Sequence, residues 1–354
     1  MPTIKLAHGD AIDVANATPS QSVDLVIVDP PYFRVKDLEW DKQWSSEQDY
    51  LAWLEACLQA FIRTLKPNGS LYLFCGARLA ADTEMLVRRH MRLLNHIVWA
   101  KPSGRWNGCN AMSLRSYFPA TERVLFAELG GSDGKARQQG QYHQACQQLR
   151  RQVFSSLIEY FRSAREAAGV TASDIKAATG VGMASHWFGY SQWQLPSREQ
   201  YEKLQALFAT KLDRQYDGLV ADYQGLAQTY GELAASYDEL REQFDRLRRP
   251  FFVTKSQPYT DVWTYPPVQS YPGKHPCEKP ASMLEDMIQA SSRPGDTVAD
   301  FFAGSGSTAK AALRLGRHFI GSELDKDRHR QTSLEIDELH HSLNQLPDHT
   351  PRQC

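Results

Sequence analysis

The sequence lacks several features that would assign it to common protein classes. No apolar run approaches the ~18 residues that a membrane helix needs, and the first residues lack a charged segment followed by an apolar one, as a signal peptide would have. Six cysteines are scattered without a CxxC pair, which argues against a zinc knuckle or a disulfide framework. His143 and Cys146, or His275 and Cys277, are isolated pairs without a second pair of matching spacing, so we expect no metal site.

Charge is also nearly balanced. The net charge of −1 gives no global attraction to nucleic acid, so any contact with DNA must come from local basic surface. Length (354 residues) and a mean hydropathy of −0.50 fit a soluble, two-part, cytoplasmic protein that does not associate with a membrane.

The most informative motif follows an apolar run near the start of the chain. Residues 23–28 predict a buried strand, and Asp29, Pro30, Pro31 and Tyr32 come directly after it. Two consecutive prolines fix the backbone in an extended form with free carbonyls. A carboxylate, a proline carbonyl and an aromatic face together suit the amino group of a flat base. Alone, the four residues are equally consistent with a strand that ends in a proline turn.

A glycine-rich motif lies near the other end of the chain. Residues 297–308 predict a short strand, a turn and the start of a helix, and Gly304 and Gly306 would let a ligand approach the backbone closely. Glu323 follows the next predicted strand at a spacing that suits a ribose contact. The pattern from Asp300 is not the dinucleotide Gly-x-Gly-x-x-Gly. It therefore favours a nucleoside cofactor over NAD.

An Asp-Pro-Pro-Tyr box followed by a Phe-x-Gly-x-Gly box, in this order, resembles the β-class amino-methyltransferases of DNA. The segment His275-Pro276-Cys277-Glu278-Lys279-Pro280 is similar to a third motif of that family. The resemblance covers residues 1–130 and 255–330. It implies S-adenosylmethionine as cofactor and double-stranded DNA as substrate, in a cytoplasmic enzyme of a bacterium or phage that acts at the nucleoid.

The resemblance also implies roles for individual residues. Its catalytic set maps onto Asp29, Pro30, Pro31 and Tyr32, with Phe33 as an assisting residue. Its cofactor contacts map onto Asp300, Phe302, Ala303, Gly304, Ser305, Gly306 and Glu323. Two further cofactor contacts are implied, namely Lys279 beside the methionyl carboxylate and Asp10 near the adenine.

The fold that this family implies is α/β, a Rossmann-like class I methyltransferase with a circularly permuted motif order and a mostly parallel seven-stranded sheet. The expected strands are residues 4–7, 23–28, 70–74, 96–100, 123–127, 297–300 and 318–321. We expect residues 1–135 to form the catalytic half, 136–250 an inserted all-α region with a coiled coil, 251–335 the cofactor-binding half, and 336–354 a tail.

The first part of the predicted insertion, residues 154–207, resembles repressor-type helix-turn-helix domains. A helix closed by Gly169, a second helix over 172–179 and a third over 183–188 carry the resemblance. It would place Ser185 and His186 in a major groove. The alternative is a small helical subdomain that only packs. Among the basic clusters, Arg248 and Arg249 are candidate phosphate contacts, although such clusters are more often solvated helix faces.

The second part, residues 209–249, carries a seven-residue repeat. Aromatic residues recur at one position and leucine at the other, in the series Tyr216, Tyr223, Tyr230, Tyr237, Phe244, Phe251 and Leu212, Leu219, Leu226, Leu233, Leu240, Leu247. This spacing is typical of a coiled coil. We expect a homodimer through this helix or an arm that spans DNA, with an intramolecular hairpin as the alternative.

The expected reaction is methyl transfer to the exocyclic N6 of a flipped adenine. The base assignment follows from aspartate at position 29, because the cytosine-N4 relatives more often carry serine there; cytosine-N4 transfer is the near alternative. An inactive DNA-binding regulator is the alternative of another class, and the intact boxes argue against it. The motifs do not bear on whether a restriction enzyme accompanies the chain.

Overall fold

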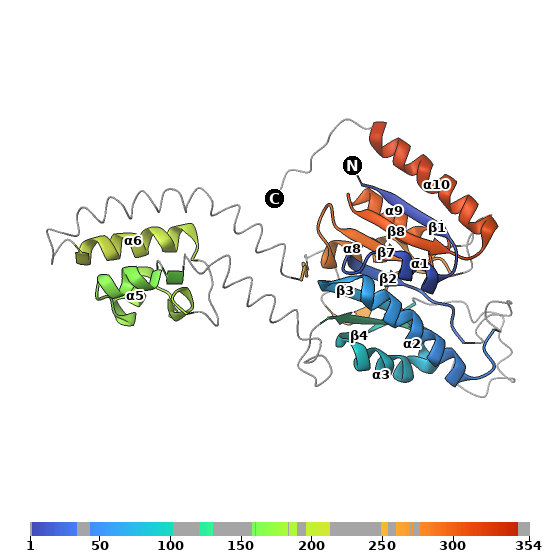
Figure 1. The fold of residues 1–354 in the computed structure, drawn as a ribbon, viewed down its shortest axis with the longest axis horizontal. Helices are drawn as coiled ribbons and strands as arrows, with labels where there is room; N and C mark the ends of the chain where they lie inside the picture. The colour runs from blue at the N-terminus through green and yellow to red at the C-terminus, as the bar shows by residue number, and fades with distance from the viewer. Residues whose placement is uncertain are drawn as a thin grey trace. The chain divides into compact units, whose positions relative to one another are not determined.

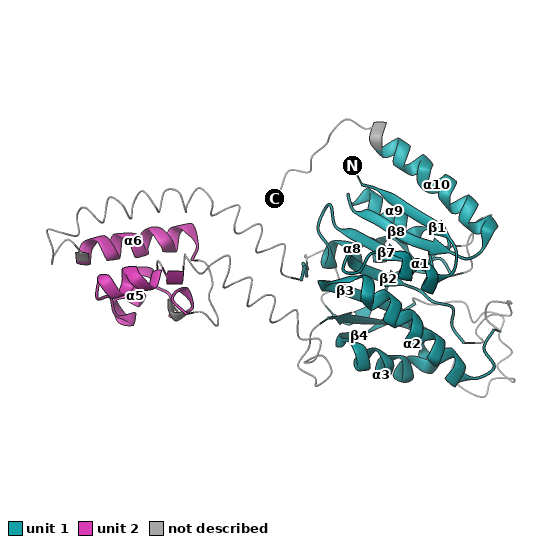
Figure 2. Cartoon of the chain, viewed as in Figure 1, with its two compact units in different colours: residues 1–142, 249–354 teal, residues 143–248 magenta. Residues whose placement is uncertain are grey.

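The computed structural model describes residues 2–33, 43–101, 120–129, 158–159, 161–182, 184–189, 196–212, 249–253, 260–269, 271 and 277–345. The chain divides into two compact units, one of residues 1–142 and 249–354 and the other of residues 143–248 (Figure 2). The predicted heptad helix lies outside the described residues from 213 to 248.

The first unit is built on a mixed sheet of eight strands in the order β1-β8-β7-β2-β3-β5-β4-β6 (Figure 1). The strands are β1 (Ile4–His8), β2 (Val23–Val28), β3 (Leu65–Gly76), β4 (Arg92–Ala100), β5 (Thr121–Glu128), β6 (Val262–Trp263), β7 (Thr297–Asp300) and β8 (His318–Glu323). A strand occurs at each of the seven predicted places. The sheet is therefore the expected α/β sheet with one strand more.

Two details of the sheet differ from the prediction. The additional strand is β6, which pairs with β4 through only two residues. Two residues are too few to show the alternation of apolar and polar side chains that identifies a strand in a sequence. Strand β5 runs antiparallel to both β3 and β4, whereas the other described pairs are parallel. Strand direction depends on connections far along the chain, which local patterns do not encode.

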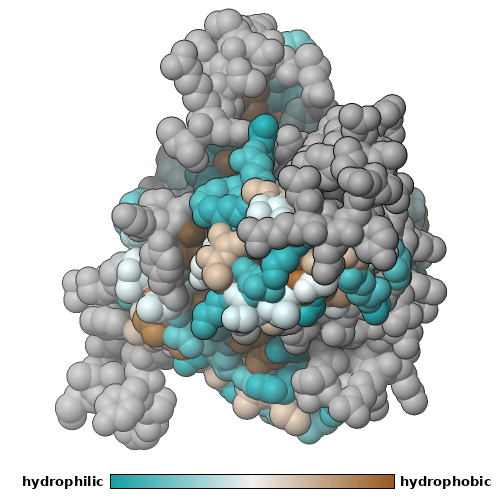
Figure 3. All heavy atoms as spheres, turned by 90° about the vertical axis from the view of Figure 1, so that its left-hand side faces the viewer, coloured by the Kyte–Doolittle hydropathy of each residue, from teal (hydrophilic) through white to brown (hydrophobic). Residues whose placement is uncertain are grey.

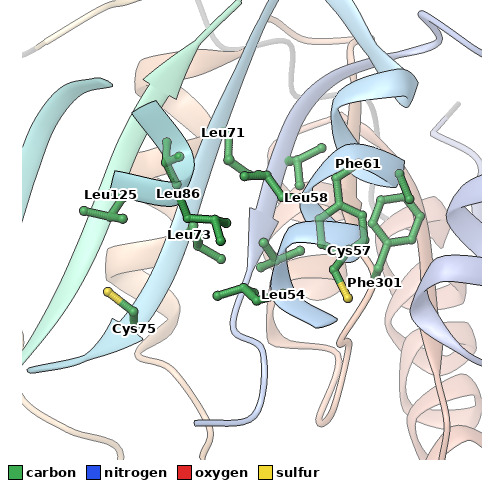
Figure 4. Close-up of a cluster of buried hydrophobic side chains, with 14 of the residues drawn as sticks. Leu54, Cys57, Leu58, Phe61, Leu71, Leu73, Cys75, Leu86, Leu125 and Phe301 are labelled. Carbon is green, nitrogen blue, oxygen red and sulfur yellow. The ribbon is translucent and has the colours of Figure 1, made fainter. Parts of the chain in front are cut away.

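Helices cover both faces of this sheet. One face is covered by α1 (Ala11–Ala17), α2 (Glu47–Thr64) and α3 (Ala80–His90), and the other by α8 (Ala281–Ser291), α9 (Ser307–Arg314) and α10 (Lys326–Gln345). All six residues of β2 are buried because Val26 and Val28 face the first layer while Leu25 and Ile27 face the second. Figure 4 shows the first layer, where Phe61 of α2 stacks on Phe301 with ring centroids 4.8 Å apart.

Residues 336–354 were predicted to be a tail. Helix α10 begins ten residues earlier, at Lys326, and includes the first part of that segment as far as Gln345. It packs on the turn between β7 and α9, where the Thr332 hydroxyl donates to the Gly304 carbonyl over 2.7 Å. The first turn of α2 is closed by a capping box between Ser46 and Asp49.

The second unit is helical and has its own core. Residues 161–167 form a helix, followed by α5 (Ala172–Thr179) and α6 (Arg198–Leu212). Helix α5 starts with a capping box at Thr171 and ends at Gly180, whose φ of 73° only glycine adopts readily. The core is formed by large apolar side chains from all of these segments, among them Phe161, Ile175, Trp187, Phe188 and Leu204.

The third segment of the predicted helix-turn-helix is a 3-10 helix, η4 (Ala184–Trp187), and not an α-helix. Gly182 and Gly189 stand on either side of it and leave room for little more than one turn. The described part of this unit therefore has a helix, a glycine turn and a further helical segment at the predicted places, but this last segment is shorter than predicted.

Among the described residues, no helix is long and apolar enough to cross a bilayer. On the face shown in Figure 3, the coloured part of the surface is a mixture of hydrophilic and hydrophobic residues.

The packing of α10 on the glycine turn predicts a difference between two glycines. Gly306 and Gly316 both have positive φ, 69° and 74°. A Cβ at Gly306 would lie 2.6 Å from Thr332 Cγ2, whereas a Cβ at Gly316 would meet nothing within 4 Å. Both substitutions by alanine carry backbone strain of about 1–2 kcal/mol. Because Gly306→Ala adds overpacking of roughly 1–3 kcal/mol, urea unfolding should show the larger loss of stability for Gly306→Ala. Equal losses would contradict this packing.

Candidate active site

Five neighbouring strands end at one edge of the sheet. Strands β1, β8, β7, β2 and β3 are joined by parallel pairs, so their carboxyl ends lie together. Acidic residues stand at four of these ends, namely Asp10 after β1, Glu323 on β8, Asp300 on β7 and Asp29 after β2. The structure thus brings together residues from the two ends of the chain.

The turn after β7 is held by two of these carboxylates. Asp300 accepts hydrogen bonds from the Phe302 amide at 3.0 Å and from the Thr308 hydroxyl at 2.7 Å. Glu323 accepts from the Gly304 amide at 2.8 Å. Gly304 has a φ of 52°, which favours glycine. The turn is therefore fixed before any ligand is bound.

Residues next to the turn complete its environment. Ala303 donates its amide to the Ser322 carbonyl at 2.9 Å, and the Ser305 carbonyl accepts from the Lys310 ammonium at 2.9 Å. Phe302 lies against Trp53, with ring centroids 5.8 Å apart. A Cβ at Gly306 would lie 2.6 Å from Thr332 of α10, so packing against α10 also favours glycine at this position.

Asp10 and Glu323 lie near each other, because they follow and end the neighbouring strands β1 and β8 at one side of the sheet. The Gly9 amide donates to the Glu323 carbonyl at 3.1 Å, which places the loop after β1 beside the end of β8. Asp10 also caps α1, because its carboxylate accepts from the Ile12 amide at 2.8 Å. Glu323 is the last residue of β8, whereas the sequence placed it beyond the strand.

Asp29 is part of a cluster of charged and hydroxyl groups. The Tyr32 hydroxyl donates to Asp29 Oδ1 at 2.8 Å, and the Lys279 ammonium is hydrogen-bonded to Asp29 Oδ2. Glu122, at the start of β5, lies 3.2 Å from the Tyr32 hydroxyl and 3.6 Å from Lys279 Nζ. The Lys101 ammonium pairs with the other oxygen of Glu122. Two carboxylates and two ammonium groups thus share one site.

The pKa values follow from this arrangement. Burial raises the pKa of Asp29, and the nearby Glu122 charge adds to the rise while Lys279 opposes it. Burial also raises the pKa of Tyr32 well above its ordinary value, so its hydroxyl keeps its proton. Burial favours neutral Glu122, but the Lys279 and Lys101 ammonium groups outweigh it and lower the pKa of that carboxyl. Lys279 has a raised pKa despite its burial, because Asp29 and Glu122 stabilise its charge.

Glu122 and Lys101 were missed by the sequence analysis. Lys101 directly follows the predicted strand 96–100 and Glu122 directly precedes the predicted strand 123–127, so both charges flank strands, but only the antiparallel direction of β5 brings Glu122 to this edge. Lys279 was expected beside a cofactor carboxylate, and the structure places it on Asp29 and Glu122. Phe33 is buried and its ring lies 6.0 Å from that of Tyr50, so it packs in the core.

The candidate DNA contacts have separate positions. Arg249 pairs with Glu128 at 2.5 Å and its guanidinium lies 5.4 Å from the centre of the Phe126 ring, so it holds the chain against the sheet of the first unit. This geometry does not support Arg249 as a reader of DNA. Ser185 and His186 lie in η4 of the second unit, and Arg248 lies outside the described residues. Among the described residues, no three His, Cys, Asp or Glu side chains form a metal site.

The buried Asp300 carboxyl predicts a pH-dependent stability. Burial raises its pKa to about 7 from an ordinary value of 3.8, despite the hydrogen bonds from Thr308 and Phe302. The folded state therefore binds more protons than the unfolded state between these pH values, and the free energy of unfolding falls as pH rises through this range. Asp300→Asn cannot ionise, so its stability relative to wild type should be higher at pH 8 than at pH 5, as measured by urea unfolding.

The matched control is Asp49→Asn. Hydrogen bonds from Ser45 and Ser46 lower the pKa of Asp49, so its contribution is present above the unfolded pKa and is lost as pH falls through the folded pKa. Asp49 is ionised in both the folded and the unfolded state at pH 5 and at pH 8, so the relative stability of Asp49→Asn should be the same at these two pH values. If the stability of Asp300→Asn relative to wild type were the same at pH 5 and pH 8, the pKa of Asp300 would not be raised in the folded state.

Comparison with known proteins identifies relatives along the whole chain. The protein shares 47% identity with the type II methyltransferase M2.DpnII of Streptococcus pneumoniae over 70 residues, which are 19% of this chain and 26% of that relative. It shares 22% identity with the DNA adenine methyltransferase YhdJ of Escherichia coli (strain K12) over 345 residues, 96% of this chain and 85% of YhdJ. The chain thus matches about a quarter of the first relative and most of the second.

The solved structures that resemble this chain include the following two. The complex of M1.HpyAVI with SAM matches 95% of this chain and 100% of its own, with a TM-score of 0.48 and 17% identity. The cytosine-N4-specific PvuII DNA methyltransferase matches 97% of this chain and 94% of its own, with a TM-score of 0.49 and 14% identity.

The family comparison covers far more of the chain than any single motif. A family model described as DNA methylase, N6_N4_Mtase, matches residues 23–334 and so includes the Asp29 cluster, the glycine turn and the second unit. This protein belongs to the N6/N4 DNA methylase family.

Proposed function

We propose that the protein transfers the methyl group of S-adenosylmethionine to the exocyclic N6 of an adenine in double-stranded DNA. The observation that carries this proposal is the position of Asp29, which stands at the end of β2 directly beside β7 and its glycine turn. An amine bound at Asp29 and a cofactor bound at the turn would therefore be neighbours. Such positioning of two reactants is the main requirement of a direct transfer.

The glycine turn and its carboxylates fit this cofactor. Each oxygen of Glu323 accepts one backbone hydrogen bond, from Gly304 and from Asp325 at 2.8 Å, and keeps a further lone pair that can accept from a ribose hydroxyl. Asp10 lies beside it at the same edge. When bound, S-adenosylmethionine supplies an electrophilic methyl group on a sulfonium cation, and the acidic residues around the turn favour a positive charge.

The Asp29 cluster fits the amino group of a base. The N6 lone pair of adenine is delocalised into the ring, so the amine is a weak nucleophile. Hydrogen bonds from its N–H groups to the Asp29 carboxylate and the Pro30 carbonyl free that lone pair. Pro31 keeps the box extended, and the Tyr32 ring offers a stacking surface. Because N6 is paired inside a duplex, the base is flipped out before it reaches this site.

Adenine is the favoured base for two reasons. Asp29 is the residue type found in adenine enzymes of the resembled family, and YhdJ, which matches most of this chain, is named as a DNA adenine methyltransferase. The cytosine-N4 alternative shares every other feature of the site. An inactive regulator is disfavoured because the Asp29 cluster is complete, with each carboxylate paired to an ammonium group.

We further propose that the order of the motifs is circularly permuted and that the second unit selects the target sequence. The Asp29 box precedes the glycine turn in the chain, which supports the permutation. The separate core of the second unit and its α5, glycine turn and η4 support a module that acts apart from the catalytic sheet. We likewise propose a homodimer through the heptad segment, residues 209–249, and a cytoplasmic, bacterial or phage setting.

The proposed reaction predicts the effect of Asp29→Ala. The variant loses the acceptor for the target amine, so methyl transfer to duplex DNA should fall by at least ~10²-fold, while S-adenosylmethionine binding stays within a few-fold. Transfer is measured with labelled cofactor, and hydrolysis of the product should yield N6-methyladenine. Retained activity would disprove the role of Asp29. N4-methylcytosine as the sole product would instead support the alternative base.

Deletion of residues 143–248 tests the role of the second unit. The deletion keeps Arg249 and its ion pair with Glu128, and it removes a unit that has its own core. We expect methyl transfer to persist with relaxed sequence selectivity, as measured by methylation-sensitive sequencing of treated DNA. Light scattering of the same variant should report a monomer if the heptad segment mediates dimerisation. An unchanged set of methylated sites would exclude this unit as the reader.

A further inference from the structure

The Tyr32 hydroxyl lies between two carboxylates and has only one proton to offer. It is 2.8 Å from Asp29 Oδ1 and 3.2 Å from Glu122 Oε2. When both carboxylates are ionised, the Tyr32 hydroxyl can donate to only one of them, and the other pair of oxygens faces each other without a hydrogen bond. When one extra proton enters the cluster, both contacts become hydrogen bonds, since protonated Asp29 can donate to the Tyr32 oxygen while Tyr32 donates to Glu122. The arrangement is thus complete only with a proton that the resting site lacks.

Two lysines bind the carboxylates on either side of the Tyr32 hydroxyl, and these lysines differ in exposure. Lys279, whose side chain is only 9% exposed, contacts both Asp29 and Glu122 and keeps the two carboxylates close together. Lys101, whose side chain is 34% exposed, binds the outer oxygen of Glu122. The two carboxylates are equally exposed, at 18% for Asp29 and 17% for Glu122, so the direction follows from Lys101: Glu122 is the end linked to the more exposed ammonium group.

We propose that Asp29, Tyr32 and Glu122 form a relay that removes the proton lost by the target amine during methylation. This proposal rests on the proposed function. The bond between the methyl carbon and the amine nitrogen forms as the sulfur–carbon bond breaks and leaves its electron pair on sulfur. The amine then gives one N–H proton to Asp29. Asp29 passes a proton to Tyr32, Tyr32 passes its own to Glu122, and Glu122 releases it to water, so each group returns to its starting state.

The ionisation of the groups agrees with these roles. Asp29 has a pKa raised by burial and by the Glu122 charge, which favours acceptance of a proton. Tyr32 stays neutral and so has a proton to pass. The charged and titratable groups that influence Asp29 and its partners are Lys279 and Cys277 before α8, Glu122 on β5, Lys101 after β4, Cys75 on β3 and Asp300 on β7.

The test measures single-turnover methyl transfer to duplex DNA at saturating S-adenosylmethionine. Glu122→Gln and Tyr32→Phe keep the shape of the site but interrupt the relay, so each should lower the rate constant by at least ~10-fold, with cofactor and DNA affinities within about 3-fold of wild type. The double variant should be no slower than the slower single variant, because both changes interrupt the same chain. Multiplicative losses, or wild-type rates in either variant, would overturn the relay.

Glu84→Gln is the matched control. Glu84 is also a carboxylate of low exposure, paired with Arg88 and His96 on α3 and β4, and it does not touch Tyr32 or Asp29. Its rate should equal that of wild type. The acid limb of the rate profile should move to lower pH in Glu122→Gln, because the variant lacks the negative charge that raises the pKa of Asp29. An unmoved acid limb would overturn the coupling on which the relay depends.

A readout independent of activity separates this proposal from the proposed function. Titration of carbon-13-labelled Asp29 by NMR should give a lower pKa in Glu122→Gln and a higher one in Tyr32→Phe, which lacks the hydrogen bond that stabilises the carboxylate. An Asp29 pKa that neither variant changes would overturn the relay whether or not DNA is methylated. A wild-type protein that methylates no DNA would overturn the proposed function alone.

Discussion

A carboxylate buried at the end of a central strand is stable only with a compensating charge, and the ion pair between Lys279 and Asp29 provides it. Desolvation of an isolated charge costs several kcal/mol even after relaxation. Lys279 precedes α8 near the end of the chain, whereas Asp29 lies near its start, so the pair can form only when both halves of the sheet have assembled. The structure around the site can be understood as the scaffold that brings these two residues together.

Strand direction is part of that scaffold. Since β5 is antiparallel to β3, Glu122 at the beginning of β5 lies opposite Gly76 at the end of β3. A parallel β5 would have placed its last residue there instead. Gly76 in turn lies against the Tyr32 ring, because a Cβ at that position would be 3.4 Å from Tyr32 Cδ2. One antiparallel strand therefore supplies the second carboxylate, and the end of β3 lies against the aromatic ring.

The sequence predicted the parts of this protein that depend on local patterns. The apolar run that ends at Val28 predicted a central strand, because burial on both faces produces a continuous apolar segment. The spacing of residues around Gly304 predicted the glycine turn. The sequence did not predict β6, whose two residues carry no periodicity, or Glu122, whose role exists only through the pairing of β5 with β3. Gly306 was assigned to the cofactor because the motif contains it, and the sequence did not show that Thr332 of α10 also restricts this position.

The charge of the sheet edge bears on which part of the chain can attract DNA. Asp10, Asp29, Asp300 and Glu323 gather where the strands end, and an acidic edge attracts a cationic cofactor but repels phosphates. The two lysines of the Asp29 cluster are already paired with carboxylates, so they add little free positive charge. With a net charge of −1, the chain has no general attraction for a polyanion. Affinity for the duplex must then come from basic residues away from this edge. The residues at the edge then have to accommodate only the cofactor and the flipped base.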